Sequence, residues 1–386
     1  MLQLTSPSVA IVHDYLNQCG GAERVALELA RTWPGAPVYT SLYHERSTFP
    51  EFAGIDVRVT QLQRLHVDGG FRALAPLYPL AFRDLGTLAH DVVISSSSGW
   101  AHGVRTAPDT THIVYCHTPA RWLYRGDQHL GRSVGPVLLA PLTRALRRWD
   151  QSSARRADIY VANCENVRRR IRSVYGRDAV VIHPPVGVER FKPRPRGDRL
   201  LLISRLLPYK RVDLIVRAAT RMGMALDVVG TGPCLSDLNT IAGRSVTFHG
   251  RVDDATLKEL LESCRALCVA ATEDFGITPV EANAAGKPVV AYADGGVLET
   301  LRDGVTAAFF HELTEEALIA AIDRADELDA EPSELAAAAR RFSAVMFRSR
   351  IRALVKRAAE ERTVGFARRE AYAATRERPR SRSRVA

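Results

Sequence analysis

Short apolar runs alternate with longer stretches of helical character along most of the chain. Runs of four or five apolar residues between helices are typical of parallel strands that are buried on both faces. In the first half we expect such strands at residues 9–12, 38–42, 56–59, 92–95, 113–116, 159–162 and 180–183. A second series follows, with strands predicted at 200–204, 226–229, 246–248, 266–271 and 288–292. The pattern therefore predicts two α/β domains, each built on a doubly wound parallel sheet.

A segment rich in proline and arginine separates the two series. Pro184-Pro185 ends the first series, and residues 192–197, Lys-Pro-Arg-Pro-Arg-Gly, precede the second. Such a composition is typical of an interdomain linker. We therefore divide the chain into a first domain, a linker, a second domain, a helix rich in alanine and arginine, and a tail, at residues 1–185, 186–198, 199–340, 341–362 and 363–386.

Composition narrows the class of protein. With 46% hydrophobic and 25% charged residues, the chain has the balance of a globular protein. No apolar run reaches the roughly 18 residues of a membrane span, and residues 1–8 lack the basic and apolar regions of a signal peptide. The six cysteines form neither a C-x-x-C pair nor a zinc-ligand spacing, so we expect reduced thiols, no metal site and a cytoplasmic location.

The net charge of +10 is unevenly distributed. Residues 366–386 contain seven arginines against two glutamates and almost no large apolar groups, which predicts a disordered basic tail. Such a tail can attract an anionic membrane from its cytoplasmic side, or it can serve only to keep the protein soluble. The apolar stretch 74–82, between Arg72 and Arg83, is a second candidate for membrane contact. Its alternative, which we favour, is a proline-kinked helix packed in the first domain.

The ten residues 272–281, Thr-Glu-Asp-Phe-Gly-Ile-Thr-Pro-Val-Glu, carry the clearest chemistry. They lie between a predicted strand and a predicted helix, and thus form a strand-to-helix turn. Glu273 and Glu281 are carboxylates that can each accept paired hydrogen bonds from vicinal hydroxyls. The backbone N–H groups expected to point outward at the helix start, where they can bind an anion or a hydroxyl, are those of Phe275, Gly276, Ile277 and Thr278. The spacing alone also fits a solvated helix start.

Two further turns follow predicted strands of the first domain. Gly20-Gly21 opens a helix after the first strand, and paired glycines there let a ligand approach the backbone closely. Residues 117–122, His-Thr-Pro-Ala-Arg-Trp, follow the strand at 113–116. His117 therefore stands at the carboxyl end of a strand, where ligands bind in open α/β sheets. For a lone histidine, the alternative is a structural role in capping a helix.

Two cations follow the first strand of the second domain. Arg205 and Lys210 lie in the loop after the strand at 200–204. Two cations there suit a diphosphate, which arrives negatively charged and gains more charge as a leaving group. The alternative is a pair of solvated surface cations.

In this order, the glycine loop, His-Thr-Pro, Arg-x4-Lys and Glu-x7-Glu together resemble the retaining family 4 glycosyltransferases. The resemblance covers residues 9–359 and implies the GT-B fold, in which two Rossmann-like domains face a cleft and the last helix returns to the first domain. It implies transfer of a sugar from a nucleotide diphosphate to a saccharide or lipid-linked acceptor, in the synthesis of cell-surface polysaccharide or glycolipid. The apolar residues expected on the returning helix are Phe342, Val345, Met346, Ile351, Leu354 and Val355.

The resemblance implies roles for residues of the second domain. Arg205 and Lys210 would hold the diphosphate and stabilise the departing charge. Glu281 would bind the ribose hydroxyls, and Glu273 would hold the donor sugar together with the outward N–H groups of the turn. Because two protein cations can replace a metal at the diphosphate, we expect an enzyme that needs no metal and no cofactor beyond its nucleotide-sugar substrate.

The resemblance also implies roles for residues in the walls of the cleft. His117 would lie near the C6 hydroxyl of the sugar, with its carbonyl oxygen close to the reacting carbon. Gly20 and Gly21 would close over the phosphates from the first domain. Arg251 and Val252, at the end of the strand at 246–248, would lie where main-chain groups read the base.

The string 117–122, together with the serines at 95–98, resembles bacterial mannosyltransferases of O-antigen and exopolysaccharide assembly, which implies GDP-mannose as donor. Ala120 departs from the methionine associated with the O-antigen branch. Asp253 and Asp254 are the nearest carboxylates for a guanine edge, although Asp254 is expected to cap the next helix. A UDP-sugar is the alternative donor. An epimerase of the same architecture and a silent nucleotide-sugar-binding module are the alternatives to a transferase, and we expect no nucleic-acid partner.

Overall fold

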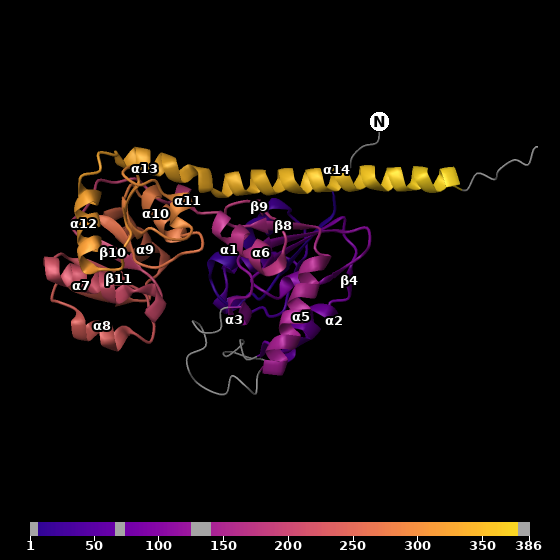
Figure 1. The fold of residues 1–386 in the computed structure, drawn as a ribbon, viewed down its shortest axis with the longest axis horizontal. Coiled ribbons are helices and arrows are strands. Elements are labelled where there is room, and N and C mark those ends of the chain that lie inside the picture. The colour runs from indigo at the N-terminus through magenta and orange to yellow at the C-terminus, as the bar shows by residue number, and fades with distance from the viewer. Residues whose placement is uncertain (1–6, 66–73, 125–139, 377–386) are drawn as a thin grey trace, which may run out of the picture.

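The computed structural model describes residues 7–65, 74–124 and 140–376, and it contains two separate parallel sheets (Figure 1). The first sheet has the order β3-β2-β1-β5-β7-β8-β9. Its strands are β1 (Val9–His13), β2 (Val38–Thr40), β3 (Val57–Val59), β5 (Val92–Ser97), β7 (Thr111–Cys116), β8 (Ile159–Ala162) and β9 (Val180–Val181). A small parallel pair, β4 (Thr87–Leu88) and β6 (Arg105–Thr106), lies outside this sheet.

The second sheet has the order β12-β11-β10-β13-β14-β15. Its strands are β10 (Leu200–Ile203), β11 (Leu226–Val229), β12 (Val246–Gly250), β13 (Ala266–Val269), β14 (Val289–Tyr292) and β15 (Ala307–Phe310). In both sheets the chain builds outward on one side of the first strand and then crosses to the other side. This arrangement is that of Rossmann-like sheets, and it confirms the predicted fold class.

Helices pack against both sheets. Those of the first domain are α1 (Gly21–Thr32), α2 (Tyr78–Asp84), α3 (Arg121–Tyr124), α5 (Ala140–Arg156) and α6 (Glu165–Tyr175). Those of the second are α7 (Val212–Met222), α8 (Leu235–Ile241), α9 (Asp254–Ser263), α10 (Ile277–Ala284), α11 (Val297–Thr300), α12 (Glu315–Asp326) and α13 (Pro332–Ala339). A last helix, α14 (Ala344–Arg376), follows the second domain in the chain.

The central strands are buried along their length because both of their faces are covered. All five residues of β1 and all six of β5 are buried. Val12 of β1 is in register with Tyr39 of β2 on one side and with Ser95 of β5 on the other. The strand order reverses between β1 and β5 and again between β10 and β13, so the carboxyl ends of these strands are the switch points where ligands bind in this class of fold.

One predicted strand and one predicted helix cap differ from the structure as follows. The strand expected at 180–183 is only the two-residue edge strand β9, and Pro184-Pro185, which lack backbone N–H groups for a strand ladder, follow soon after it. Asp254 is not the cap of α9, as we expected. The side chain of Asp253 accepts a hydrogen bond from the Thr256 N–H at 2.7 Å, and Asp254 is the first helical residue.

Helix α14 packs against the first domain although it follows the second in sequence (Figure 1). The side chains that join the core of the first domain are those of Phe347, Ile351, Leu354, Val355 and Ala358. Phe342 is buried just before the helix, in the core that continues between the domains. The prediction was wrong for Val345 and Met346, which are 59% and 38% exposed, because they lie on the outer side of the first turn.

The helix also continues beyond the expected end. It runs to Arg376, so the disorder expected from residue 363 is wrong over 363–376, while 377–386 lie outside the described residues. In the described part of the chain, no helix is long and apolar enough to cross a membrane.

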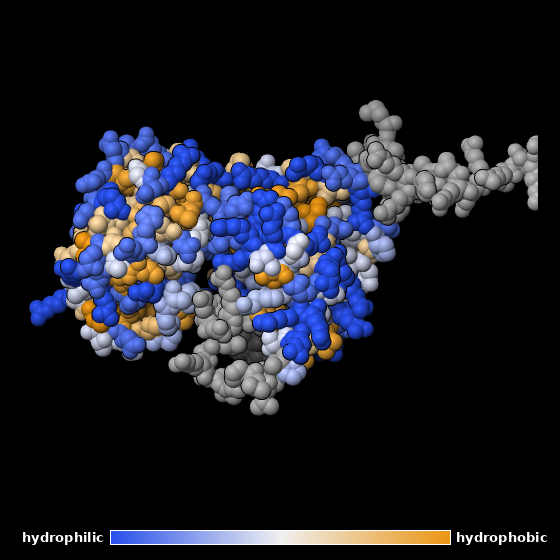
Figure 2. Space-filling view, viewed as in Figure 1, coloured by the Kyte–Doolittle hydropathy of each residue, from blue (hydrophilic) through white to orange (hydrophobic). Residues whose placement is uncertain are grey.

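The apolar stretch 74–82 comprises a turn at 74–77 and the first five residues of α2. Tyr78, Ala81 and Phe82 are buried in the first domain, whereas Leu77 and Leu80 are exposed, and the neighbouring Arg72 lies outside the described residues. The packed helix is therefore the better description of most of this stretch. Figure 2 shows apolar patches interspersed with hydrophilic side chains on the face drawn, over both domains.

Candidate functional site

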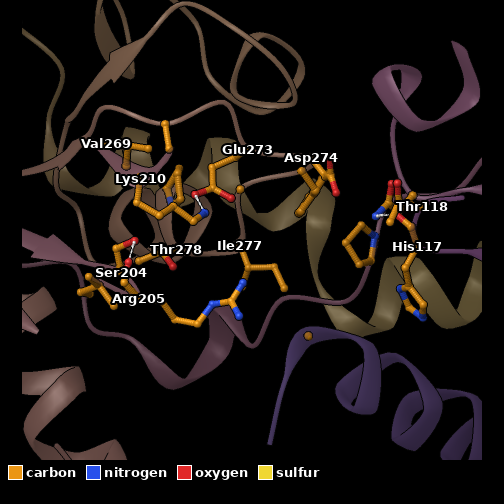
Figure 3. Close-up of a pocket in the computed structure, with 18 of the residues that line it drawn as sticks. His117, Thr118, Ser204, Arg205, Lys210, Val269, Glu273, Asp274, Ile277 and Thr278 are labelled. Atoms are coloured by element: carbon orange, nitrogen blue, oxygen red, sulfur yellow. Dashed lines mark hydrogen bonds and ion pairs between the residues drawn. The ribbon is translucent and has the colours of Figure 1, made fainter. Parts of the chain in front are cut away.

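A hollow of about 580 Å³ lies between the two domains. It is lined by the carboxyl ends of β10 and β13 and by the loop after β7, so it opens at the switch points of the fold (Figure 3). Its volume is in the range of ligand pockets, and large enough for a nucleotide sugar. The predicted site residues that line it are Gly21, His117, Arg205, Lys210, Glu273, Phe275, Gly276, Ile277 and Thr278.

The turn between β13 and α10 is held in a conformation that needs glycine. Gly276 has φ +84°, in the left-handed region, and is the N-cap of α10. A Cβ atom on Gly296 would lie 2.1 Å from the Asp274 carbonyl oxygen, so the segment at Gly295-Gly296 is seated directly against the turn. The N–H of Gly296 donates to the Glu273 carbonyl at 2.8 Å. The backbone of the turn is thereby fixed from within the second domain.

Lys210 and Glu273 form an ion pair at the hollow, with 2.6 Å between Nζ and Oε1 (Figure 3). Lys210 ends a short 3₁₀ helix, Pro208–Lys210, and Glu273 lies on the turn after β13. Arg205 lines the same side, and its Nη2 donates to the Tyr209 hydroxyl at 3.0 Å. A lysine ammonium has three donors, so Lys210 can hold Glu273 and an anion at the same time.

His117 stands on the opposite wall, in the first domain (Figure 3). Its Nε2 is 2.8 Å from the Ser96 hydroxyl, and its carbonyl accepts a hydrogen bond from the Asn163 amide at 3.0 Å. Burial, and after it the His13 ring, lowers the pKa of His117 to about 3. The ring is therefore neutral at pH 7, and it can bind a hydroxyl but does not carry a charge.

Glu281 is placed away from the hollow lining. It is only 9% exposed, and Nη2 of Arg190 lies 2.7 Å from its Oε1. Burial raises the pKa of Glu281, against the opposing effect of Arg190. The carboxylate expected to bind ribose thus already has an arginine partner, which a ribose would have to share or displace.

Three more predicted residues are not among those that line the hollow. Arg251 is exposed, and Val252 packs against the core that joins the domains. Gly20 is the N-cap of α1, and a Cβ atom there would lie 2.5 Å from Oε2 of Glu23. This contact is with the end of a flexible side chain and can be relieved by a shift of the Glu23 carboxylate.

Sequence reasoning missed the role of Asp14. This buried carboxylate accepts hydrogen bonds from the backbone N–H groups of Ser98, Trp100 and Ala101 at 2.6, 3.1 and 2.7 Å. It thereby shapes the loop from which Ser98 lines the hollow. The only signal in the sequence is its position directly after the first strand.

It also missed the pairing of Asp274 with Arg121 and Arg170, two arginines of the first domain. Arg121 and Asp274 each belong to a string with clear chemistry, but nothing in either string says that they meet. Among the described residues, no group of three or more histidine, cysteine, aspartate or glutamate side chains is arranged to hold a metal ion.

Two Rossmann-like domains with a ligand-sized hollow at their switch points define the GT-B class of fold. Solved structures share it at identities that establish the fold alone. They include Anabaena HepE in complex with UDP and glucose (TM-score 0.69, 20% identity, 91% of this chain and 99% of that one). Sucrose-phosphate synthase from Thermosynechococcus elongatus is also similar (TM-score 0.62, 18% identity, 95% and 99%).

Family models divide the chain at the linker. Residues 19–190 match "Glycosyltransferase Family 4", and residues 189–342 match "Glycosyl transferases group 1". The chain therefore carries both domains of a family 4-type glycosyltransferase.

Curated relatives match part of the chain. D-inositol 3-phosphate glycosyltransferase of Mycobacterium leprae is 29% identical over 184 residues, which are 41% of this chain and 43% of that protein. The same enzyme of Mycobacterium tuberculosis is 29% identical over 187 residues, 41% and 38%. The chain thus spans about two fifths of the length of these relatives.

Proposed function

We propose that this protein is a retaining glycosyltransferase, which moves a sugar from a nucleotide diphosphate to a saccharide or lipid-linked acceptor. The observation that carries the proposal is the hollow with Arg205, Lys210 and Glu273 on one wall and His117 on the other. Cations on one side suit a diphosphate, and a carboxylate with a neutral histidine suits a polyhydroxylated sugar.

In this proposal each wall of the hollow has a separate task. Lys210 and Arg205 stabilise the charge that develops on the leaving diphosphate, because preorganised donors there act mainly in the transition state. Glu273 orients the sugar through its hydroxyls while remaining bonded to Lys210. His117 stays neutral and contacts the sugar from the first domain. In this arrangement the two domains hold the donor between them.

We propose GDP-mannose as the donor and a cell-envelope saccharide or lipid as the acceptor. The donor proposal is supported by the His-Thr-Pro-Ala-Arg-Trp string and the serines at 95–98. Of the two carboxylates considered for guanine, Asp253 is engaged in capping α9, and Asp254 is 3.8 Å from Nη1 of Arg190. UDP-sugars remain the second candidate, because the base-reading residue is not fixed by these contacts.

Calorimetric titration of the protein with GDP and with UDP tests the donor. A site that pairs the guanine edge disfavours uracil by well over roughly tenfold, because its polar groups are then unpaired. Tighter binding of UDP would replace the GDP-mannose proposal and leave the transferase proposal standing.

The transferase proposal is tested by incubating the protein with GDP-mannose and UDP-glucose and a panel of cell-envelope acceptors. Mass spectrometry detects the product, and NMR of its anomeric proton reads retention. Conversion of the donor sugar without an acceptor would indicate an epimerase. Nucleotide binding without any donor turnover would indicate a silent binding module.

Turnover is expected to survive an excess of EDTA, since Arg205 and Lys210 already supply two cations at the proposed diphosphate position. The measurement is the rate of product formation before and after chelation. Loss of activity that magnesium or manganese restores would contradict a metal-independent reaction.

A further inference from the structure

Asp274 lies at the junction of the two domains. It belongs to the turn that carries Glu273, and its two carboxylate oxygens pair with different arginines of the first domain. Oδ2 pairs with Arg121, which directly precedes Trp122 in α3, and Oδ1 pairs with Arg170 of α6. The side chains of Asp274 and Arg170 are 17% and 15% exposed, so this pair is largely buried, whereas the Arg121 side chain is 32% exposed.

The same part of the first domain grips the turn at a second point. The thiol of Cys164, the N-cap of α6, donates to the Asp274 carbonyl at 2.8 Å. Nη1 of Arg170 also donates to the Thr118 hydroxyl at 3.3 Å, next to His117. Helices α3 and α6 therefore hold the side chain of Asp274, and the N-cap of α6 also holds its main chain.

On its other side the turn is seated within the second domain. Gly296 fits so closely that a Cβ atom on it would lie 2.5 Å from Cα of Phe275. The turn is thus pressed between the glycine segment of its own domain and the arginines of the other domain. The carbonyl oxygens of Glu273 and Asp274 lie so close to Gly295 and Gly296 that neither glycine has room for a Cβ atom. A displacement of Asp274 is therefore expected to move the adjacent Glu273 as well.

Two arginines facing one carboxylate make the cluster sensitive to the distance between the domains. When the domains separate, both pairs break together, because the two arginines belong to the first domain and the aspartate to the second. Removal of one partner from a desolvated pair leaves an uncompensated charge, which costs more than the intact pair contributes. The cluster therefore has a sharp preference for one arrangement of the domains.

We propose that Arg121, Asp274 and Arg170 form a clamp that sets the donor-sugar turn against the His117 wall as the cleft closes. They are positioning residues, which act on the reaction through Glu273. The proposal rests on the proposed transferase function. It joins the His-Thr-Pro-Ala-Arg-Trp string and the Glu-x7-Glu turn into one unit, with an arginine from the first and an aspartate from the second.

The test is Asp274→Asn, which keeps the shape of the side chain and removes its charge. Glu299→Gln is the matched control. Glu299 of α11 also crosses between the domains and accepts the N–H groups of Glu165 and Asn166 at 2.7 and 3.1 Å, but it lies outside the donor turn. Asp274→Glu keeps the charge and should recover part of the activity.

For sugar transfer, Asp274→Asn is expected to lower kcat at least about tenfold, while the KM for the donor stays within about threefold. Glu299→Gln should keep kcat within about threefold. Arg170→Gln should resemble Asp274→Asn, and the double variant should lose no more than either single one. Equal losses in Asp274→Asn and Glu299→Gln, or an unchanged kcat in Asp274→Asn, would overturn the clamp.

A second measurement does not depend on the reaction. Small-angle scattering should show a larger radius of gyration for Asp274→Asn than for the parent protein, and thermal unfolding verifies that the variant is folded. If the parent protein transfers no sugar, the proposed function fails, and scattering still decides the clamp. Unchanged scattering would then overturn it.

Discussion

Lys210 has to serve two negative groups at once if the proposed function is right. In the structure its ammonium bonds Glu273, and in the reaction it would also face the developing charge on the diphosphate. A single preorganised donor of this kind contributes several kcal/mol to the transition state. Among the described residues, Lys210 is the only ion-pair partner of Glu273. Removal of Lys210 therefore also affects the turn that carries Glu273.

Lys210→Ala is accordingly expected to lower kcat by about two orders of magnitude or more. The measurement is steady-state turnover of the donor that the parent protein uses. Arg217→Ala is the matched control, because Arg217 is an exposed cation of the same domain, and its turnover should match the parent. A Lys210→Ala variant with near-normal turnover would remove the lysine from the diphosphate site.

The buried side chain of His112 should make the stability of the protein depend on pH. It is 1% exposed, its Nε2 is 2.8 Å from the Ser95 hydroxyl, and burial, followed by His102 and Arg156, lowers its pKa from 6.5 to about 3. A lowered histidine pKa means that the folded state disfavours the proton. The contribution is therefore fully present above pH 6.5 and is lost as the pH falls toward 3, by about 2 kcal/mol at pH 5.

Urea unfolding at pH 7 and pH 5 measures this loss. His112→Gln keeps a hydrogen-bonding group without the titration, so its free energy of unfolding should fall less between the two pH values. His311→Gln, at an exposed position, should keep the parental dependence. An equal fall in all three proteins would contradict the assignment to His112.

The sequence was sufficient to predict the site residues that stand at the carboxyl ends of strands. Arg205, Lys210, Glu273 and His117 all stand just after predicted parallel strands, and parallel strands bring their carboxyl ends to one edge. The two arginine partners of Asp274 could not be predicted in this way, because these ion pairs depend on how the two domains meet. The Arg190 partner of Glu281 was missed for the same reason of non-local contact.

At the scale of elements, burial on both faces made most strands visible, since each gives an unbroken apolar run. The edge of the second sheet was missed. β15 is the four-residue run Ala307–Phe310, which is fully buried, but two alanines fit a helix as well as a strand. Helix α12, which packs on β15, was not predicted either. The role of both elements is clear only from the complete sheet, in which β15 is the edge strand and α12 covers it.

Helix α14 is stabilised by the packing of its apolar face on the first domain rather than by its intrinsic helix propensity. Phe347 is 2% exposed and lies edge-on to Tyr115 of β7, with 5.8 Å between the ring centroids. Phe347→Ala should lower the free energy of unfolding by about 3–5 kcal/mol, because it removes a buried ring and leaves a cavity.

Urea denaturation followed by circular dichroism measures the effect. Val345→Ala is the control, since Val345 is exposed on the same helix and its removal should cost less than about 0.5 kcal/mol. Similar small losses for both variants would mean that α14 is not anchored through this face.

At the scale of the whole molecule, we expect peripheral binding to anionic membranes. The protein has a net charge of +10, and its last residues are rich in arginine. Each basic residue near an anionic leaflet contributes about 1 kcal/mol, so several together give measurable binding at low salt. The exposed Leu77, which precedes α2, and Leu80 within it can add apolar contact.

Sedimentation with vesicles tests this prediction. The protein should pellet with anionic vesicles at low salt, less so at high salt, and not with neutral vesicles. A variant that ends at residue 362 should bind more weakly, because it lacks the arginines that follow. Full recovery of the complete chain in the supernatant would contradict membrane binding.

The path of α14 has a consequence for the order of synthesis. The strands of the first domain are complete once β9 has left the ribosome, yet its apolar core also includes Phe347, Ile351 and their neighbours in α14. The entire second domain must be translated before these side chains emerge. The nascent first domain therefore carries an uncovered apolar face while the second domain is translated, and that face is a natural substrate for ribosome-associated chaperones.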